Sequence, residues 1–384
     1  MRLKDALTKA LAEHTFEAAN ILVAVPDATR PLDMEVVLRP LLERCAWGSK
    51  VSIMPAVGLH RPMTPAELAP IERVAAEFGA AVVSHDAYGE QLVCVSEDVG
   101  LAPGAAGVLP AVFPRAVAQA DLIVCVGLVE PHQYAGFSGG VKTVCIGCAG
   151  AQTISAMHGL TYLRDAHTAL GVVEGNPFRA ALRRLAGVLP EMLALHVVPA
   201  EQPYVVFGAV RSSFEQASAH ASTSLFRDVE EQVEHVILPV VGSKGANMYQ
   251  ASRAATYAIL VDRPAVRKGG WVLVEATCEE GFGEGAGERA CAGAMMRGAV
   301  ALREELATGS RTLSGGEQRA FVIARALARN PIAFIGAPGH PSLDAVGIPC
   351  FSSRTEAMGA LGLEGAGVRV FEDVFHRVPR HAKG

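Results

Sequence analysis

The fold is decided by the stretch DLIVCVG (121–127), which runs directly into the glycine-rich segment EPHQYAGFSGGVKT (130–143). A short, almost continuous apolar run of this kind is typical of a strand buried on both faces of a parallel sheet. The runs ILVAV (21–25) and VSIMPAV (51–57) have the same character, and each also opens onto polar, turn-forming residues. The sequence therefore predicts parallel strands whose ends carry polar segments.

Helical patterns alternate with these strands. Residues 3–13 place apolar side chains at helical spacing, and the run AAVVSHD (80–86) reads as a further strand. Between them, Thr64-Pro65-Ala66-Glu67 is a capping box with proline at the first helical position, which predicts a helix over about 65–79. Alternation of this kind predicts an α/β fold with mostly parallel sheets.

The strand and helix alternation restarts after residue 200 of the 384, and the small, polar run ASAHASTS (217–224) reads as a linker. We therefore expect two α/β domains with the active site in a cleft between them. The first would cover 1–222 and be rejoined by a C-terminal tail of about 368–384, and the second would cover 225–367.

Composition excludes several classes of protein. Half of the residues are hydrophobic and 19% are charged, which excludes intrinsic disorder. The net charge of −5 comes without a block of like charge, so we expect no nucleic-acid partner and no membrane. The eight cysteines are scattered, and Cys145 and Cys148 form a CxxC without the second pair that a zinc site needs. We expect reduced thiols and a cytoplasmic protein.

Four polar segments stand out as candidate ligand sites: DATRP (27–31), GLHRP (58–62), EPHQYAGFSGGVKT (130–143) and SAMHG (155–159). We expect all four to follow strands directly, because ligands of open parallel sheets bind at strand ends. Asp27 and Thr29, taken alone, are equally compatible with ordinary turn residues.

Lys142 has a more specific interpretation. The chain has 27 arginines but 7 lysines, so it normally supplies positive charge with arginine. A lysine in a glycine-lined loop therefore suggests that the site needs an amine nitrogen, which can form a covalent link. Gly136, Gly139 and Gly140 would let the backbone approach a phosphate or a flat ring closely. A role for Lys142 as a simple phosphate counter-ion remains the alternative.

Two segments resemble nucleotide-hydrolysing ATPases. GFSGGVKT (136–143) approaches the phosphate-loop pattern but has Val141 where that pattern needs glycine. LSGGEQRAFVIARALARNP (313–331) resembles the signature segment of ABC transporter ATPases. The strand that follows, IAFIGAPG, lacks the Asp-Glu pair that would hold magnesium and activate water, so the sequence disfavours an ATPase.

Taken together, DATRP, GLHRPMT, PHQYAGFSGGVK, a histidine sixteen residues after the lysine, and NMYQASR resemble a known family in order and spacing. The chain is similar to the nickel-pincer lactate racemases and their 2-hydroxyacid racemase and epimerase relatives. His132 and Lys142 are ten residues apart, and Lys142 and His158 are sixteen apart, as the family pattern requires.

The resemblance implies a cofactor and its ligands. Lys142 would bind covalently to a nickel-pincer nucleotide, pyridinium-3,5-bisthiocarboxylic acid mononucleotide, whose synthesis requires separate accessory proteins. Two sulfurs, a ring carbon and the imidazole of His158 would hold the nickel, and soft sulfur with imidazole suits such a metal. Asp27, Thr29 and the glycines Gly136, Gly139 and Gly140 would contact this cofactor or orient the site.

The resemblance also implies the catalytic and substrate-binding groups. His60 and His132 would be the two acid/base groups, and Arg30 would bind the substrate carboxylate. A racemase must exchange a proton with either mirror image, and two imidazoles from different strand ends suit that need. While one histidine takes the hydroxyl proton, hydride would move to the cofactor, and the 2-keto acid would take it back on its other face.

The second domain departs from the family pattern. Where the lactate racemases have Gln-x-x-Lys, this chain has Gln250 and Arg253, preceded by Tyr249, and these three would line the substrate pocket. A solvated helix face is the alternative for Gln250 and Arg253. The expected function is racemisation or epimerisation of a small 2-hydroxy acid. The alternatives are a non-catalytic cofactor carrier of the same fold and an enzyme that uses Lys142 as a Schiff base.

Overall fold

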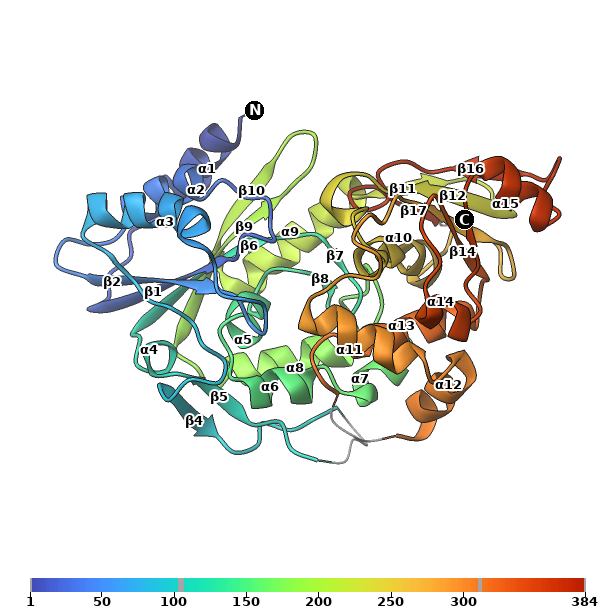
Figure 1. Cartoon of the computed structure of the whole chain (residues 1–384). Helices are drawn as coiled ribbons and strands as arrows, with labels where there is room; N and C mark the ends of the chain where they lie inside the picture. Colours follow the sequence, from blue (N-terminus) through green and yellow to red (C-terminus); the bar gives the residue numbers. More distant parts are fainter. Residues whose placement is uncertain (1, 103–106, 310–312, 383–384) are drawn as a thin grey trace. The chain divides into compact units, whose positions relative to one another are not determined.

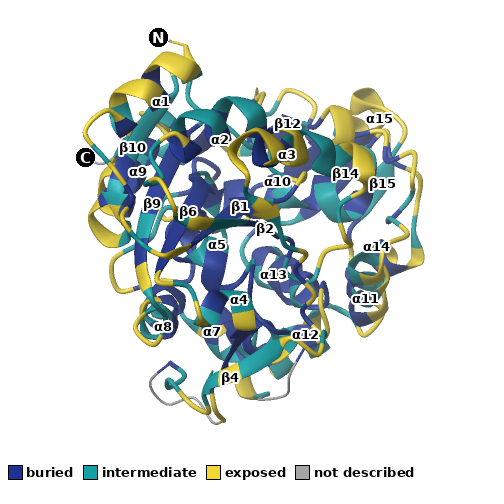
Figure 2. Ribbon diagram, turned by 90° about the vertical axis from the view of Figure 1, so that its left-hand side faces the viewer, coloured by how far each residue is buried: buried dark blue, intermediate teal, exposed yellow. Residues whose placement is uncertain are grey.

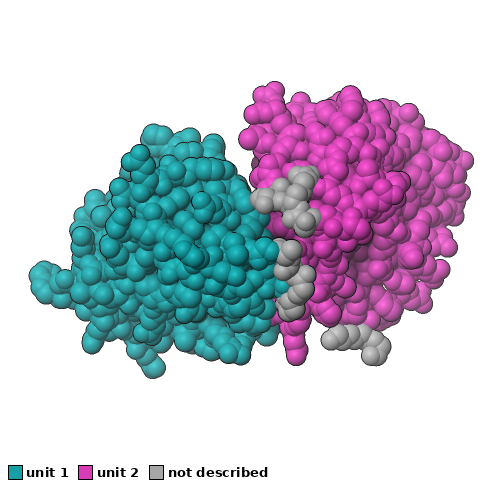
Figure 3. All heavy atoms as spheres, turned by 90° about the horizontal axis from the view of Figure 1, so that it is seen from below, with its two compact units in different colours: residues 1–130, 137–157, 177–223 teal, residues 131–136, 158–176, 224–384 magenta. Residues whose placement is uncertain are grey.

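The protein is described by a computed structural model that covers residues 2–102, 107–309 and 313–382. The chain divides into two compact units (Figure 3). Unit 1 contains residues 1–130, 137–157 and 177–223, and unit 2 contains residues 131–136, 158–176 and 224–384. The chain passes from one unit to the other five times, so neither unit is a continuous stretch of sequence.

This division differs from the two nearly continuous domains that the sequence predicted. The C-terminal tail groups with unit 2 and not with unit 1, because β17 (Val378–His381) pairs in parallel with β11 (Phe226–Val229). The run at 217–224 is not a linker but the second half of α9 (Val210–Ser224). Its small residues Ala217, Ser218 and Ala221 are buried, which explains how so polar a sequence packs as a helix.

Unit 1 is built on a six-stranded sheet with the order β10-β9-β6-β1-β2-β3 (Figure 1). All neighbours pair in parallel except β9 and β10, which confirms the predicted α/β class with mostly parallel strands. The strands are β1 (Asn20–Pro26), β2 (Lys50–Ala56), β3 (Ala81–Val82), β6 (Leu122–Leu128), β9 (Glu191–Val198) and β10 (Tyr204–Ala209). All seven residues of β6 are buried, as its apolar sequence predicts (Figure 2).

Helices cover this sheet. The core packs side chains of the first three helices, such as Leu7, Leu38 and Ile71, against Val23 and Val124 of the strands. The helices of unit 1 are α1 (Leu3–Leu11), α2 (Met34–Leu42), α3 (Pro65–Phe78), α4 (Arg115–Ala118), α5 (Lys142–Cys145), α6 (Ala151–Met157), α8 (Pro177–Ala186) and α9. A hairpin of β4 (Leu92–Ser96) and β5 (Ala111–Pro114) completes the unit.

Three predictions in this region are tested directly. The capping box at the start of α3 is confirmed, since Thr64 Oγ1 accepts from Glu67 N and Glu67 Oε2 accepts from Thr64 N. The strand predicted over 80–86 is shorter, because only β3 pairs with β2 before the chain leaves the sheet. The segment SAMHG (155–159) begins inside helix α6 and does not follow a strand, so that prediction was wrong.

Unit 2 contains an all-parallel, five-stranded sheet with the order β15-β14-β13-β12-β16. Its strands are β12 (His235–Pro239), β13 (Val272–Glu275), β14 (Ile332–Ile335), β15 (Cys350–Phe351) and β16 (Val368–Val370). Its helices are α7 (Leu160–Arg164), η1 (Gly242–Lys244), α10 (Met248–Leu260), α11 (Ala286–Met295), α12 (Ala299–Thr308), α13 (Gln318–Leu327), α14 (Pro341–Ala345) and α15 (Arg354–Ala360). The short strand β7 (Pro131–His132) pairs with β8 (Gly136–Phe137). The boundary between the units falls inside β8, because Gly136 belongs to unit 2 and Phe137 to unit 1.

The segment that resembles an ATPase signature (313–331) contains the turn before α13 and the whole of that helix. Ser314 donates from both its backbone N and its Oγ to Glu317 Oε2, at 3.1 Å in each case. Gly316 has a φ of 90° and lies against α11, where an added Cβ would meet the Gly287 carbonyl oxygen at 2.2 Å. The serine, glycine and glutamate of this motif are therefore explained by a helix start and a close backbone contact.

Over the residues that the structure describes, no helix combines the length and apolar character needed to cross a bilayer.

Candidate functional site

In unit 1, His60 and Asp27 are brought together by two neighbouring parallel strands. Pro26 of β1 pairs with Ala56 of β2, so the loops that follow leave the same edge of the sheet. His60 Nδ1 lies 2.6 Å from Asp27 Oδ2, and the His60 side chain is 61% exposed. With Nδ1–H donating to the carboxylate, the neutral imidazole presents Nε2 as a proton acceptor.

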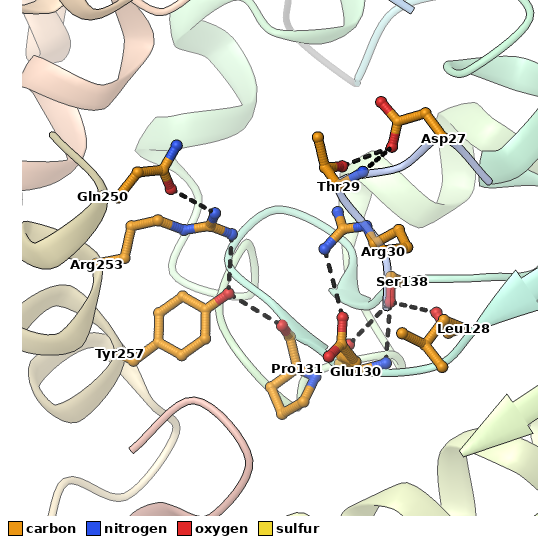
Figure 4. Close-up of polar contacts among 10 residues, drawn as sticks. All are labelled: Asp27, Thr29, Arg30, Leu128, Glu130, Pro131, Ser138, Gln250, Arg253 and Tyr257. Atoms are coloured by element: carbon orange, nitrogen blue, oxygen red, sulfur yellow. Dashed lines mark hydrogen bonds and ion pairs between the residues drawn. The ribbon is translucent and has the colours of Figure 1, made fainter. Parts of the chain in front are cut away.

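The environment of Asp27 keeps its carboxylate charged. Burial by itself would raise the pKa of Asp27, but the hydrogen bond and charge of His60, the Thr29 hydroxyl and the charge of Arg30 together lower it below its usual value. Thr29 donates from its Oγ1 at 2.5 Å and from its backbone N at 3.2 Å to Asp27 Oδ1 (Figure 4). Asp27 and Thr29 thus act as a turn that orients His60, which combines the two interpretations that the sequence allowed.

Arg30 has an acidic partner that the sequence analysis missed. Its Nη1 lies 3.4 Å from Glu130 Oε2, and the Arg30 and Glu130 side chains are 29% and 12% exposed (Figure 4). Ser138 fixes the Glu130 backbone, since Glu130 N donates to Ser138 Oγ and Ser138 N donates to Glu130 O. The signal for Glu130 was its position just after β6, at the same sheet edge as Arg30.

A cavity of about 830 Å³ opens beside Asp27 and Arg30 within unit 1. Its other lining residues come largely from α1, α2 and α3, and they include both acidic and basic side chains. Arg30 therefore borders open space on one side and Glu130 on the other.

Lys142 is the first residue of α5, directly after the glycine turn, and it is partly exposed. Gly139 and Gly140 have φ values of 79° and 63°, which favour glycine. A Cβ on Gly139 would meet Val129 Cγ2 at 2.8 Å, and one on Gly140 would meet the Phe214 ring at 3.0 Å. Packing within the protein therefore already requires these glycines, and their predicted contact with a cofactor stays a prediction.

Gly136 is required for a similar reason. It belongs to unit 2, has a φ of 71°, and a Cβ there would lie 2.1 Å from the Val172 carbonyl oxygen.

The Lys142 turn is supported by two buried side chains that the sequence analysis missed. His196 of β9 is fully buried, and its Nε2 accepts a hydrogen bond of 2.8 Å from Gly140 N. Burial, with a contribution from nearby Arg179, lowers the pKa of His196 to about 3, so this imidazole is neutral. Arg179 donates from Nη2 to Phe137 O at 2.6 Å and lies 3.6 Å from the centroid of the Phe214 ring.

The His60 loop and the segment after Lys142 are joined by a backbone hydrogen bond, because Gly58 N donates to Gly147 O at 2.8 Å. Cys145 and Cys148, which lie on the same segment, are both fully buried and unpaired by disulfides. Burial raises the pKa of each thiol, so both stay protonated.

In unit 2, His132 has a different environment from His60. Its Nδ1 accepts from the backbone N–H groups of Tyr134 at 3.2 Å and Ala135 at 3.1 Å. An imidazole nitrogen that accepts hydrogen bonds carries no proton, so the neutral His132 ring holds its proton on Nε2.

Tyr134 lies near both His132 and His158. Its ring centroid is 6.4 Å from that of His132 and 5.3 Å from that of His158. Burial, reinforced by Tyr249, raises the pKa of Tyr134 well above its usual value, so the phenol stays neutral. Unit 2 therefore places the predicted metal ligand and one predicted acid/base group around a single aromatic ring.

Helix α10 carries the three residues predicted to line the substrate pocket. The Asn247 side chain caps this helix by accepting from Gln250 N at 2.9 Å. Gln250 Oε1 accepts from Arg253 Nη1 at 3.2 Å, and Arg253 Nη2 donates to Tyr257 Oη at 3.3 Å. Tyr257 Oη donates in turn to Pro131 O at 3.2 Å (Figure 4).

This chain of hydrogen bonds links α10 to the residue before His132. Gln250 and Arg253 are half-buried and bonded to each other, which argues against a solvated helix face. Burial raises the pKa of the neighbouring Tyr249, which is also half-buried.

The predicted residues thus fall into two groups. Unit 1 holds Asp27, Thr29, Arg30, His60, Gly139, Gly140 and Lys142, and unit 2 holds His132, Gly136, His158, Tyr249, Gln250 and Arg253. Within the described part of the chain, no cluster of three or more His, Cys, Asp or Glu side chains is arranged to hold a metal ion.

Comparison with known proteins identifies relatives. Residues 3–171 match the family described as "Lactate racemase N-terminal domain". The chain is 26% identical over 287 residues to the lactate racemase of Thermoanaerobacterium thermosaccharolyticum, and 26% identical over 279 residues to that of Lactiplantibacillus plantarum. These alignments cover 72% and 69% of this chain but only 64% and 61% of the relatives.

The fold has matching solved structures. The lactate racemase apoprotein from T. thermosaccharolyticum superposes with a TM-score of 0.82 and 22% identity, covering 98% of this chain and 93% of that one. A protein from Thermotoga maritima superposes with a TM-score of 0.69 and 17% identity, covering 96% and 97% of the two chains. The resemblance expected from the sequence is confirmed, and at these identities the solved structures establish the fold.

Proposed function

Because residues 3–171 match the family described as "Lactate racemase N-terminal domain", we propose that this protein is an isomerase that interconverts the two stereoisomers of a small 2-hydroxy acid. Its curated relatives are named lactate racemases, but the chain aligns with less than two thirds of their length. The activity and the lactate-like substrate are therefore parts of the proposal.

The observation that carries the proposal is the contrast between two imidazoles. His60 directs Nδ1 at the Asp27 carboxylate, 2.6 Å away, which favours proton acceptance at Nε2. His132 receives backbone N–H groups at Nδ1, which favours donation from Nε2. Removing a hydroxyl proton at one group and returning one at another is the acid/base work that racemisation of an alcohol needs.

Substrate binding would rest on arginines. Arg253, steadied by Gln250, offers a half-buried guanidinium that would bind the substrate carboxylate with paired hydrogen bonds. Arg30 would contribute a second cation, and the substrate carboxylate would compete with Glu130 for it. Tyr249 would add an uncharged wall, since burial keeps its phenol neutral.

Lys142 and His158 are the residues that would hold a nickel-pincer nucleotide. Lys142 is partly exposed at the end of a turn fixed by packed glycines, which suits an amine that must stay in place for a covalent link. His158 offers an imidazole, a ligand suited to nickel, beside the neutral Tyr134 ring. When bound, the group would supply the acceptor for hydride from the substrate carbon.

The proposal includes partners and a location. A cofactor of this kind implies separate proteins that synthesise it, and the eight free cysteines of this chain suit a reducing, cytoplasmic compartment.

The test is a stereochemical assay of protein produced together with the cofactor-synthesis proteins. Each enantiomer of a panel of 2-hydroxy acids is incubated, and the products are separated on a chiral column. We expect interconversion of at least one acid, together with nickel content and a mass increase on the peptide containing Lys142. Nickel-loaded protein that interconverts none of the panel would contradict the proposal.

A variant distinguishes the enzyme from a cofactor carrier. His60→Gln removes the proposed base without touching Lys142 or His158. A racemase should lose turnover and keep its nickel, whereas a carrier would have no turnover in either form.

A further inference from the structure

Arg319 is a buried cation that the proposed chemistry has not used. It lies on α13, in the segment that resembles an ATPase signature, and is 2% exposed. Its Nη1 donates to Gln133 Oε1 at 2.8 Å, and its Nη2 donates to Ser252 Oγ at 3.2 Å and Thr256 Oγ1 at 3.1 Å. No carboxylate lies within ion-pair distance of it among residues 2–102, 107–309 and 313–382.

Such a group is a poor source of stability. Burial, with a further effect of nearby Arg253, lowers the pKa of Arg319 to about 10, so the guanidinium is still charged at neutral pH. A buried charge is costly to remove from water, and here only neutral oxygens compensate it. Within the described part of the chain, the Nε of Arg319 has no hydrogen-bond partner. We therefore expect Arg319 to fix the positions of its hydrogen-bond partners and not to add stability.

Those partners belong to the two parts of unit 2 that carry the candidate site. Gln133 directly follows His132, and Ser252 and Thr256 lie on α10 on either side of Arg253. The residue before His132 is held as well, since Tyr257 of α10 donates to Pro131 O. His132 is thus fixed through both of its neighbours in sequence, and both bonds lead to α10, one of them through Arg319.

We propose that Arg319 is a positioning residue that holds His132 in register with the substrate-binding face of α10. The planar fork of arginine spans Gln133 and α10 at once, which a single ammonium group cannot reproduce. The catalytic consequence of this inference rests on the proposed function, but its structural consequence, the fixed state of the His132 ring, does not.

The first measurement is independent of cofactor and substrate. Protein with ¹⁵N-labelled histidines is examined by long-range proton–nitrogen NMR, and the His132 signals are assigned by their absence in His132→Gln. We expect the Nε2–H form in the wild type and a mixture of ring forms in Arg319→Lys. A wild-type His132 pattern in Arg319→Lys would overturn the inference.

The matched control is Arg184→Lys in unit 1. Arg184 also uses its fork on a fixed target, the carbonyl oxygens of Val99 and Gly100, but contacts none of the candidate site residues. Its variant should lose a similar number of hydrogen bonds and leave the His132 signals unchanged. If Arg184→Lys changed those signals as much as Arg319→Lys does, a general loss of stability would explain the effect and the inference would fail.

The partner residue provides a rescue. Gln133→Ala should reproduce the effect of Arg319→Lys, whereas Gln133→Glu keeps an acceptor for the guanidinium and should preserve the wild-type ring form. In loaded enzyme, Arg319→Lys should lower kcat by about 10- to 100-fold with KM changed less than about threefold, because a small misplacement of a reacting group is costly. A loss confined to KM would contradict positioning.

The two proposals fail in different ways. If wild-type loaded protein interconverts no hydroxy acid, the proposed function falls, and the NMR comparison still decides the role of Arg319. If racemisation occurs but the NMR and kcat effects of Arg319→Lys match those of Arg184→Lys, only the positioning role falls.

Discussion

His60 and His132 are the same residue type in two opposite settings. In unit 1, a buried carboxylate lies 2.6 Å from His60 Nδ1, and it requires a proton on that nitrogen. In unit 2, two backbone N–H groups point at His132 Nδ1, and they exclude a proton there. The groups that contact Nδ1, and not the histidine itself, therefore decide whether Nε2 accepts or donates a proton.

The two settings also differ in what holds them. Asp27 and His60 follow adjacent strands, so the main sheet positions them directly. His132 lies on a two-residue strand and depends on side chains from α10 and α13. We therefore expect the His132 region to be the more easily perturbed by substitutions outside the site.

The largest expected effect comes from removing either ring. His60→Gln and His132→Gln should each lower kcat of the loaded enzyme by about 1,000-fold, the range associated with loss of a general acid or base. Nickel content measured by mass spectrometry should be unchanged. If one variant kept near-normal turnover, that histidine would have no acid/base role.

A smaller loss of kcat should follow from changing Asp27, the partner of His60, and not the His60 ring itself. Asp27→Asn removes the charge that fixes a proton on His60 Nδ1 and should lower kcat by about 100-fold. The control is Thr29→Val, which removes one hydrogen bond to Asp27 and should cost less than about fivefold. Equal turnover of Asp27→Asn and wild type would show that the Asp27 contact does not set the His60 ring form.

Breaking the Arg30–Glu130 ion pair should improve substrate binding and not impair the enzyme. Glu130→Gln removes the acid that competes for Arg30 and should lower the KM for a hydroxy acid by about two- to fivefold, the range of a partly exposed pair. Steady-state kinetics in low salt measure it. A raised KM would instead indicate that Glu130 orients Arg30 toward the substrate.

The smallest expected effect concerns a third histidine, and it is a pH dependence of stability. His196 resembles His132 in accepting a backbone N–H, but its pKa of about 3 lies well below its value in an unfolded chain. Between about pH 6.5 and 3 the unfolded chain binds a proton that the folded state does not, so stability falls as pH falls. His85, whose pKa burial also lowers, adds to this trend.

His196→Gln keeps an acceptor for Gly140 N–H and removes this titration. Chemical unfolding of wild type and variant across pH 4 to 7 should show a weaker pH dependence of the unfolding free energy in the variant. Parallel curves would mean that His196 does not account for the trend.

The sequence predicted the parts of the fold that local patterns determine. The ends of β1, β2, β6 and α3 lie within about one or two residues of the predicted ones, because apolar runs, turn residues and a capping box mark them. The helical state of 217–224 was missed because small polar residues are ambiguous until their burial in α9 is known.

In the candidate site too, residues within local motifs could be predicted and residues with distant partners could not. Arg253, His60 and Lys142 were accessible from motif and spacing, whereas Glu130 and His196 act through partners about 100 and 56 residues away. Arg319 was hidden in a segment that resembles another protein class. Its role depends on Gln133, 186 residues away, and a linear pattern carries no information about such a distant pair.

The interleaving of the two units has a practical consequence. A chain cut after Thr223 would keep residues 131–136 and 158–176 without the rest of their unit, and one starting at Ser224 would lack them. Neither fragment would therefore be one complete compact unit. Studies of one half alone will require grafted segments or circular permutants.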